Sequence, residues 1–423
     1  MAVQTRSVAD ICAAAKEASR TLARLDSATR DAALEAIAAA LEGRVNEIVE
    51  ANAADLKAGE EAQLSSALMD RLKLTPERVA GIARGVREIA SLRDPVGEVL
   101  DGFRLPNGLD VRKVRVPLGV VAVVYESRPN VTIDCTALAI KSGNAIVLRG
   151  SSMAENSNAI LAELAREAVA SVGVPADAIA LVAGGGREEL RDVATQDGVI
   201  DLLIPRGGEG LKKALTEYAT VPVIYAASGN CHVYVDASAD LEKARAIALN
   251  AKVQRPGVCN AAESLLVHAD VAAEFLPGVM RDLRDAGVEL RVDGRTRAAA
   301  GGDGDSLVEA TEEDWATEFL DLILAVKVVD SLDEAIAHVN RYGSGHSEAI
   351  VTDSESASRA WIESIDAAVV YVNASTRFTD GGEFGMGAEI GNSTQKLHAR
   401  GPIGLRELCT YKYVVEGSGQ IRA

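Results

Sequence analysis

One cysteine stands where a nucleophile would be placed. Cys259 follows the turn residues Pro256 and Gly257, after a helical pattern at 240–253 and before an apolar, strand-like run at 264–267. A turn exposes the side chain, while the helix and the strand on either side fix its position. The alternative is a small core residue, because free cysteine is among the most buried residue types. Cys259 alone does not decide between the two.

The other cysteines indicate neither a disulfide framework nor a zinc site. They are Cys12, Cys135, Cys231 and Cys409, and no CxxC pair or Cys/His ligand spacing occurs. We therefore expect no metal. Residues 1–20 lack a signal-peptide core, and no run of about 18 apolar residues occurs, so we expect a cytoplasmic protein that does not enter a membrane.

The overall charge narrows the choice of ligand. With 44 basic and 62 acidic residues the formal net charge is −18, which argues against nucleic acid or an anionic membrane surface as a partner. An anionic small ligand would need a local group of positive side chains. The length of 423 residues allows about two or three domains, and the 48% of hydrophobic residues can supply their cores.

The elements that position these residues follow from periodicity. Residues 6–93 show helical spacing, and residues 102–116 predict a hairpin with an Asn-Gly turn. From 119 to 236 strand and helix patterns alternate, which predicts an α/β fold with a doubly wound parallel sheet. The strands expected there are 120–125, 145–149, 179–182, 200–204, 221–226 and 232–235, and the helices are 130–141, 155–171, 188–196 and 209–218.

A second α/β region follows Cys259. Its expected strands are 264–268, 288–292, 322–329, 348–352 and 367–373, and its helices are 271–286, 332–341 and 354–365. The tail at 405–415 has a further strand pattern and is a candidate partner for the hairpin.

Ligands of doubly wound sheets bind beyond the carboxyl ends of the strands. Those ends carry glycine, serine and arginine, which are Arg128, Arg149, Gly150, Ser151, Gly184–Gly186, Arg206, Gly207 and Gly208. Glycine lets backbone N–H groups approach a ligand, and helix N-termini favour anions. The pattern predicts a phosphate-bearing ligand, most simply a dinucleotide. The alternative is ordinary turn chemistry, and no GxGxxG follows the first strand.

Three longer stretches carry a resemblance to a known family. They are Gln-Arg-Pro-Gly-Val-Cys-Asn-Ala-Ala-Glu from Gln254, Tyr-Glu-Ser-Arg-Pro-Asn-Val-Thr from Tyr125, and Asn-Ala-Ser-Thr-Arg-Phe-Thr-Asp-Gly-Gly from Asn373. They resemble the gamma-glutamyl phosphate reductases (glutamate-5-semialdehyde dehydrogenases), which belong to the aldehyde dehydrogenase superfamily. The similarity covers nearly the whole chain.

The resemblance implies a reaction and a domain plan. The reaction is NADPH-dependent reduction of L-glutamyl 5-phosphate to L-glutamate 5-semialdehyde with release of phosphate, the second step from glutamate towards proline. The domains are an NADPH-binding domain (1–101 and 118–236), a catalytic domain (237–400) and an oligomerisation element (102–117 and 401–423). A homodimer or homotetramer and contact with glutamate 5-kinase are expected. The alternatives are an NAD-dependent aldehyde dehydrogenase with another substrate and an inactive binding homologue.

The resemblance also implies catalytic roles. Cys259 would form a thioester by displacing phosphate, and Lys252 and Arg255 lie close enough in sequence to lower its pKa. An internal salt bridge is the alternative role for Arg255. Asn130 matches the superfamily's oxyanion asparagine, although it could instead cap the following helix. Tyr225 stands near the position of the glutamate that activates water in hydrolytic members.

Cofactor and substrate positions follow in the same way. Arg149 matches the position that contacts the adenosine ribose, followed by Gly150 and Ser151, and Gly207 and Gly208 match the turn near the pyrophosphate. Glu318 matches the glutamate that holds the nicotinamide ribose, with a solvated loop acid as the alternative. The candidates for the anionic groups of the substrate are Arg128, Arg255 and Arg377.

Overall fold

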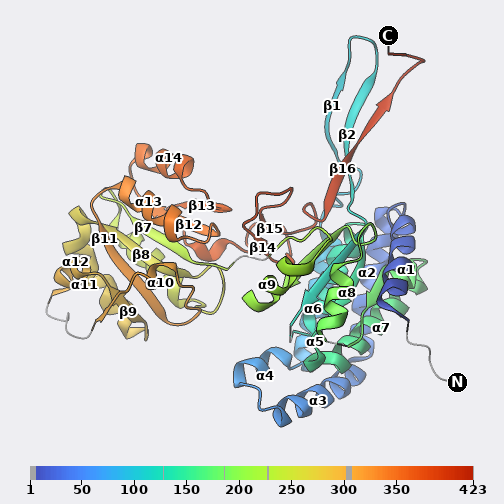
Figure 1. The fold of residues 1–423 in the computed structure, drawn as a ribbon, viewed down its shortest axis with the longest axis horizontal. Coiled ribbons are helices and arrows are strands. Elements are labelled where there is room, and N and C mark those ends of the chain that lie inside the picture. Colours follow the sequence, from blue (N-terminus) through green and yellow to red (C-terminus); the bar gives the residue numbers. More distant parts are fainter. Residues whose placement is uncertain (1–5, 127, 185, 226–227, 302–306, 423) are drawn as a thin grey trace. The chain divides into compact units, whose positions relative to one another are not determined.

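The computed structural model describes residues 6–126, 128–184, 186–225, 228–301 and 307–422. The chain divides into two compact units (Figure 1). The first unit comprises Met1–Tyr225, Gly385–Gly391 and Ile403–Ala423, and the second comprises Ala226–Phe384 and Asn392–Pro402. Each unit contains a parallel sheet with helices, so the predicted α/β fold is confirmed.

Helices at the start of the chain pack against the helices of the first unit's sheet. Helix α2 contacts α5 and α7, and α3 contacts α7. Thr75 caps α5 through its side chain, and Pro76 takes the first helical position. These front helices are α1 (Val8–Leu22), α2 (Ser27–Gly43), α3 (Val45–Glu61), α4 (Ser66–Leu72) and α5 (Pro76–Ser91).

A parallel sheet with strand order β5-β4-β3-β6 forms the centre of the first unit. Its strands are β3 (Val120–Tyr125), β4 (Ala145–Arg149), β5 (Ile179–Leu181) and β6 (Leu202–Arg206). Strands β3 and β4 are buried on both faces, which explains their continuous apolar runs. The helices are α6 (Asn130–Lys141), α7 (Glu155–Ser171), α8 (Arg187–Ala194) and α9 (Glu209–Tyr218), with 3-10 turns at Ser152–Ala154 and Ala176–Ala178.

Strands β1 (Val99–Arg104), β2 (Asp110–Pro117) and β16 (Cys409–Glu416) form an antiparallel sheet in the first unit (Figure 1). Strand β16 pairs with β2 along its whole length, from Cys409 opposite Pro117 to Glu416 opposite Asp110. The predicted hairpin and its pairing with the C-terminal tail are therefore confirmed. The hairpin begins three residues before the predicted 102, at Val99.

The parallel sheet of the second unit has the strand order β10-β9-β11-β8-β7-β12-β13. One apolar cluster packs this sheet against α10 and α11, and another packs it against α13 and α14. The strands are β7 (Cys231–Val235), β8 (Ala262–His268), β9 (Glu289–Val292), β10 (Val308–Glu309), β11 (Ile323–Val329), β12 (Ser347–Val351) and β13 (Val369–Val372). The helices are α10 (Leu241–Val253), α11 (Ala269–Asp285), α12 (Gly294–Ala299), α13 (Leu332–Tyr342) and α14 (Glu355–Ser364). Shorter elements are the 3-10 turns Asp314–Ala316 and Thr376–Phe378 and the ladder of β14 (Asn392–Ser393) with β15 (Gly401–Pro402).

Strand β7 belongs to a different sheet from the one expected. The sequence placed it in the first α/β region, which was drawn to residue 236, but it pairs with β8 and β12 in the second unit. The difference arises because the alternation of strands and helices along the chain does not determine which sheet a strand joins. Of the strand expected at 221–226, the structure shows a bridge between Val223 and Leu203, while residue 226 lies outside the described residues.

Candidate active site

Cys259 lies in the turn that connects α10 to β8, as the sequence predicts. Helix α10 ends at Val253, the turn covers Pro256 to Asn260, and β8 begins at Ala262. The cysteine is partly buried, whereas the other four cysteines are buried. Cys259 is therefore the cysteine that a substrate can reach most readily.

The backbone of Cys259 is held by the segment that leads into β7. A side chain on Gly229 would have its Cβ 1.5 Å from the Cys259 carbonyl oxygen, so only glycine fits there. The Cys231 Sγ donates to the same oxygen at 3.2 Å. Burial raises the pKa of Cys231 well above its ordinary value, and nearby Glu348 adds to the shift, so this thiol stays protonated and can donate.

The next residue ties the turn to a second segment. Asn260 donates through Nδ2 to the carbonyl oxygen of Thr379 at 3.0 Å, and its own carbonyl accepts from Thr376 Oγ1 at 2.7 Å. These bonds place the 3-10 turn Thr376–Phe378 beside the Cys259 turn. Arg377 is thereby brought into the neighbourhood of Cys259, as the sequence predicts for a substrate-binding residue.

Two guanidinium groups lie close together here. Arg377 donates from Nε to Gln254 Oε1 at 2.9 Å. Burial lowers the pKa of Arg377, and the nearby Arg255 lowers it further. Arg255 is exposed, and within the described residues neither arginine forms an ion pair, so the salt bridge considered for Arg255 is not found. An anion bound between them would relieve the repulsion.

Lys252 has a different partner from the one expected. Its Nζ lies 2.5 Å from Glu263 Oε2, and both side chains are fully buried. Burial lowers the pKa of Lys252 and raises that of Glu263 to about 7. With the charge of Lys252 matched by Glu263, Arg255 remains the candidate from this segment for lowering the pKa of Cys259.

Glu318 lies beside the same turn. Its Oε1 accepts from the N–H of Gly229 at 2.6 Å, and Gly229 packs directly on Cys259. Glu318 is partly buried, which does not fit a freely solvated loop acid. Its role at the nicotinamide ribose stays a prediction.

Asn130 begins α6 in the first unit. Its side chain does not cap the helix, because the N-cap position is taken by Pro129 and shows no side-chain hydrogen bond. Instead its Nδ2 donates to Asp134 Oδ2 at 2.8 Å, one turn along the helix. This bond orients the amide and leaves its second N–H for another acceptor. Its oxyanion role, together with Cys259 of the second unit, stays a prediction.

The carboxyl edge of the first unit's sheet suits a dinucleotide. Helix α9 begins after Gly207 and Gly208 with no side-chain cap, and no atom lies within 4 Å of a Cβ built on Gly208. Helix N-termini favour phosphate groups, and here the Gly208 N–H donates to Glu126 Oε1 at 3.4 Å, a carboxylate that an incoming phosphate would have to displace. Ser151 caps the short turn before α7, and a side chain on Gly150 would collide with Asn158. For Ser151 the alternative is therefore confirmed, because its side chain serves the turn by accepting from the Met153 N–H.

Arg149 lies at the end of β4 and is 8% exposed. Its Nη2 donates to the carbonyl of Gly186 at 2.5 Å, whereas its buried Nε has no hydrogen-bond partner among the described residues. Burial lowers its pKa, and the Glu189 carboxylate opposes that shift. The unpartnered Nε is consistent with a phosphate-bearing cofactor here. Arg128 is exposed between β3 and α6, and its substrate role stays a prediction.

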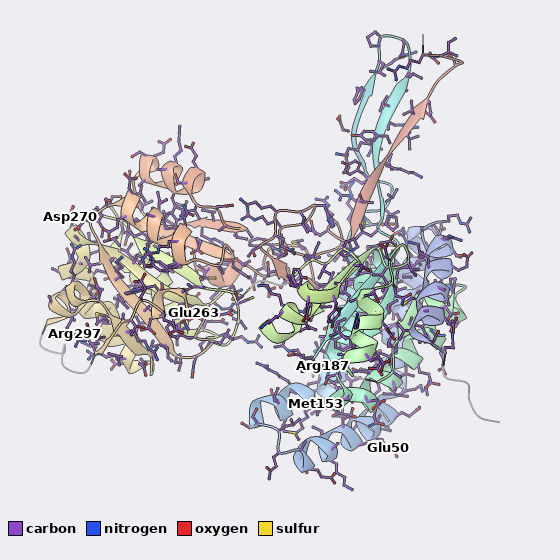
Figure 2. All side chains as sticks on the ribbon, in the orientation of Figure 1. Glu50, Met153, Arg187, Glu263, Asp270 and Arg297 are labelled. Atoms are coloured by element: carbon purple, nitrogen blue, oxygen red, sulfur yellow. The ribbon has the colours of Figure 1, made fainter. Side chains whose placement is uncertain are left out.

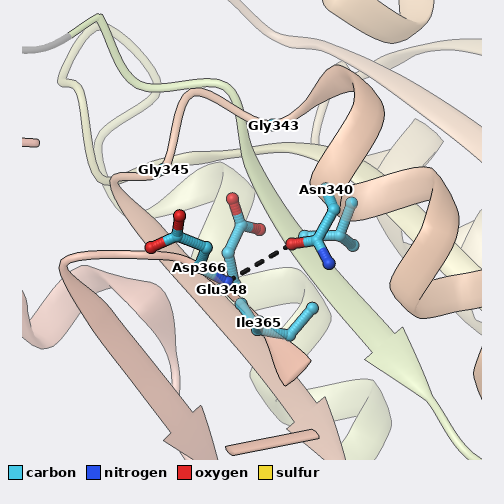
Figure 3. A pocket seen from close by; sticks show the side chains of 7 residues that line it. Asn340, Gly343, Gly345, Glu348, Ile365 and Asp366 are labelled. Atoms are coloured by element: carbon cyan, nitrogen blue, oxygen red, sulfur yellow. Dashed lines mark hydrogen bonds between the residues drawn. The ribbon is translucent and has the colours of Figure 1, made fainter. Parts of the chain in front are cut away.

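A cavity of about 280 Å³ in the second unit is lined by none of the predicted site residues. Figure 3 shows Glu348, Asp366 and Asn340 around it, with Asn340 accepting from the Asp366 N–H at 3.3 Å. Within the described ranges, no cluster of His, Cys, Asp and Glu has the composition to hold a metal. No helix in the described part of the chain combines the length and apolar character needed to cross a membrane.

Three residues that support the candidate residues, Asp134 in the first unit and Gly229 and Glu263 in the second, were missed by the sequence analysis. Gly229, Glu263 and Asp134 act through residues that lie near them in space. For Asp134 the spacing of four residues from Asn130 on one helix was an available signal. Gly229 and Glu263 show no such signal.

Comparisons with known proteins find relatives of this chain over nearly its whole length. The aldehyde dehydrogenase family matches residues 1–300 and 308–414. A gamma-glutamyl phosphate reductase of Thermobifida fusca is 54% identical over 417 residues, covering 99% of each chain. One from Heliobacterium modesticaldum is 55% identical over 408 residues, covering 96% of this chain and 97% of that protein. The crystal structure of the Thermotoga maritima gamma-glutamyl phosphate reductase matches with a TM-score of 0.96 at 46% identity, covering 99% of this chain and 100% of that one.

Proposed function

Because this chain belongs to the gamma-glutamyl phosphate reductases of the aldehyde dehydrogenase family, we propose that it reduces L-glutamyl 5-phosphate to L-glutamate 5-semialdehyde with NADPH and releases phosphate. This is the second step of proline synthesis from glutamate. The observation that carries the proposal is the reachable Cys259, fixed on its turn with Arg255 and Arg377 nearby.

A covalent step makes the reduction feasible. An acyl phosphate is a poor hydride acceptor, whereas a thioester is a better one. The Cys259 thiolate attacks the acyl carbon, the carbon–oxygen bond to phosphate breaks, and inorganic phosphate leaves. Bound NADPH supplies the hydride that reduces the thioester carbonyl. The carbon–sulfur bond then breaks, which restores the thiolate and releases the aldehyde. No hydrolytic water is required, in keeping with tyrosine at 225.

The two arginines near Cys259 give the substrate its anchor. An acyl phosphate and an α-carboxylate are both anions. Arg255 lies close enough to Arg377 to lower its pKa, so the two guanidinium groups can act on the same anion. Their charge also favours the thiolate form of Cys259. Arg128 is a further candidate for the same anionic substrate.

Alanine at 229 is expected to lower kcat by about 100-fold. Its methyl group would lie 1.5 Å from the Cys259 carbonyl oxygen, so the turn must shift. A misplacement of about 1 Å costs on the order of 100-fold in rate. Gly257→Ala is the matched control from the same turn, because its Cβ would meet only Leu320 O at 3.6 Å. Steady-state kinetics of both variants would test this, and wild-type activity in Gly229→Ala would contradict it.

Arg149 is proposed to select NADPH over NADH through the 2′-phosphate. Replacing it with glutamine should raise KM for NADPH about tenfold or more, because a hydrogen bond to a charged group contributes about 1.5–3 kcal/mol. KM for NADH should change little, and this cofactor is the internal control. An equal rise for both cofactors would show that Arg149 acts only through its bond to Gly186.

A homo-oligomer, a dimer or tetramer, is proposed to form through the antiparallel sheet. Strand β16 is an edge strand, and the sheet exposes Val99, Phe103, Tyr411, Tyr413 and Val415, each at least 47% accessible. Tyr413→Glu should therefore sediment as a smaller species than the wild type in analytical ultracentrifugation. Unchanged sedimentation would place the subunit contact elsewhere.

The reverse reaction tests the proposed function. Purified protein is given glutamate semialdehyde and NADP, with and without phosphate, and NADPH absorbance is followed. Phosphate-dependent NADPH formation is expected. NADPH formation that ignores phosphate would indicate an ordinary aldehyde dehydrogenase, and no NADPH under any condition would indicate an inactive homologue.

A further inference from the structure

A buried ion pair closes the base of the segment that carries Cys259. Lys252 lies in the last turn of α10 and Glu263 is the second residue of β8, so the two side chains join the ends of the segment. Lys252 Nζ lies 2.5 Å from Glu263 Oε2, and neither side chain is exposed. Figure 2 shows Glu263 within the second unit. The pair therefore restricts where the intervening turn can lie.

The second oxygen of Glu263 reaches a different part of the chain. Glu263 Oε1 accepts from the N–H of Leu320 at 3.2 Å. Leu320 has a φ of 54°, which is unfavourable for a leucine and must be held by its surroundings. Two residues earlier, Glu318 accepts from Gly229, and Gly229 packs on Cys259. The Glu263 carboxylate thus contacts both Lys252, at the base of the Cys259 segment, and Leu320, two residues after Glu318.

The charges around Glu263 make this arrangement sensitive to substitution. Lys252 from α10 faces it, and Glu318 lies near enough to raise its pKa. Asp321 and Cys231 lie near Lys252 and raise its pKa. Removing one member of a buried ion pair leaves an uncompensated charge, whereas replacing both with neutral groups of similar size often leaves stability unchanged.

We infer that Glu263 is a positioning residue, which through Lys252 sets the place of Cys259 and through Leu320 sets the place of Glu318. The inference rests on the proposed function for the roles of Cys259 and Glu318. Glu263 is fully buried, so it acts through the residues that it contacts. Its two oxygens act on different targets, so its two contacts can be removed separately.

Two neutral double variants separate the contacts. Lys252→Met with Glu263→Gln removes the ion pair but keeps an amide oxygen for the Leu320 N–H. It should melt close to the wild type, lower kcat by about 10- to 100-fold and leave KM for NADPH unchanged. Lys252→Met with Glu263→Met removes both contacts, so KM for NADPH should also rise several-fold. If the second double variant does not fold, the first still tests the ion pair through kcat, because glutamine keeps the size of the Glu263 side chain and no buried charge is left uncompensated.

Two measurements without turnover keep this test separate from the proposed function. They are the rate at which iodoacetamide alkylates Cys259, followed by mass spectrometry, and NADPH binding followed by fluorescence. The alkylation rate should change in both double variants, and NADPH binding should weaken only in the second. A variant with wild-type melting, alkylation and kcat would overturn the inference. If the wild type fails the phosphate assay but these shifts occur, the proposed function falls and the positioning role stands.

Discussion

Replacing Cys259 with alanine is expected to abolish turnover while NADPH binding stays intact. The thioester cannot form without the thiol, and removing a catalytic nucleophile lowers kcat by about 10⁴-fold or more. The loss of one sulfur from a partly buried turn residue should leave the fold unchanged. Stopped-flow or steady-state absorbance measures the turnover, and fluorescence titration measures NADPH binding.

The control for this variant is Cys12→Ala, in α1 of the first unit. Cys12 is fully buried, and burial raises the pKa of its thiol to about 11, so it does not act as a nucleophile near neutral pH. Turnover should persist in this variant. A Cys259→Ala protein that keeps most of its activity would show that the nucleophile lies elsewhere.

Replacing Asn130 with alanine is expected to lower kcat by about 10²- to 10³-fold, because one oxyanion donor contributes about 3 kcal/mol. The structure supports this role indirectly. Asn130 does not cap α6, and its amide is oriented by Asp134 at 2.8 Å with one N–H left to donate. Asp134→Ala should lower kcat less, by about tenfold, since the amide stays but loses its orientation.

The kinetic pattern of Asn130→Ala separates two roles. A donor that stabilises only the oxyanion affects kcat and kcat/KM together, without raising KM. A raised KM with unchanged kcat would mean that Asn130 binds the substrate in its ground state. That result would remove Asn130 from the proposed catalytic groups.

Much of the fold could be predicted because its signals are local. The bounds of β3, β4, α6, α7 and α9 agree residue for residue with the sequence pattern. Buried strands are continuous apolar runs, and the helices between them begin and end at clear polar or glycine boundaries. The sheet to which β7 belongs was predicted wrongly, because pairing with β8 and β12 depends on segments far along the chain.

The same distinction applies to the site. Cys259 could be identified from its turn, and the resemblance then gave it a role. Lys252 was assigned to the cysteine by proximity in sequence, but Glu263, eleven residues away, is its partner. Gly229 gave no signal, because its importance arises from contact with a backbone thirty positions later. Contacts of this kind become visible only when the segments are placed in space.

Trapping the acyl-enzyme tests the central claim most directly. The protein is mixed with glutamate semialdehyde and NADP without phosphate, NADPH is quantified rapidly, and the peptide that carries Cys259 is analysed by mass spectrometry. The predicted result is a burst of about one NADPH per chain and a glutamyl thioester on Cys259, which added phosphate discharges into further turnover. Steady NADPH formation without phosphate, or an adduct on another residue, would contradict the proposed mechanism.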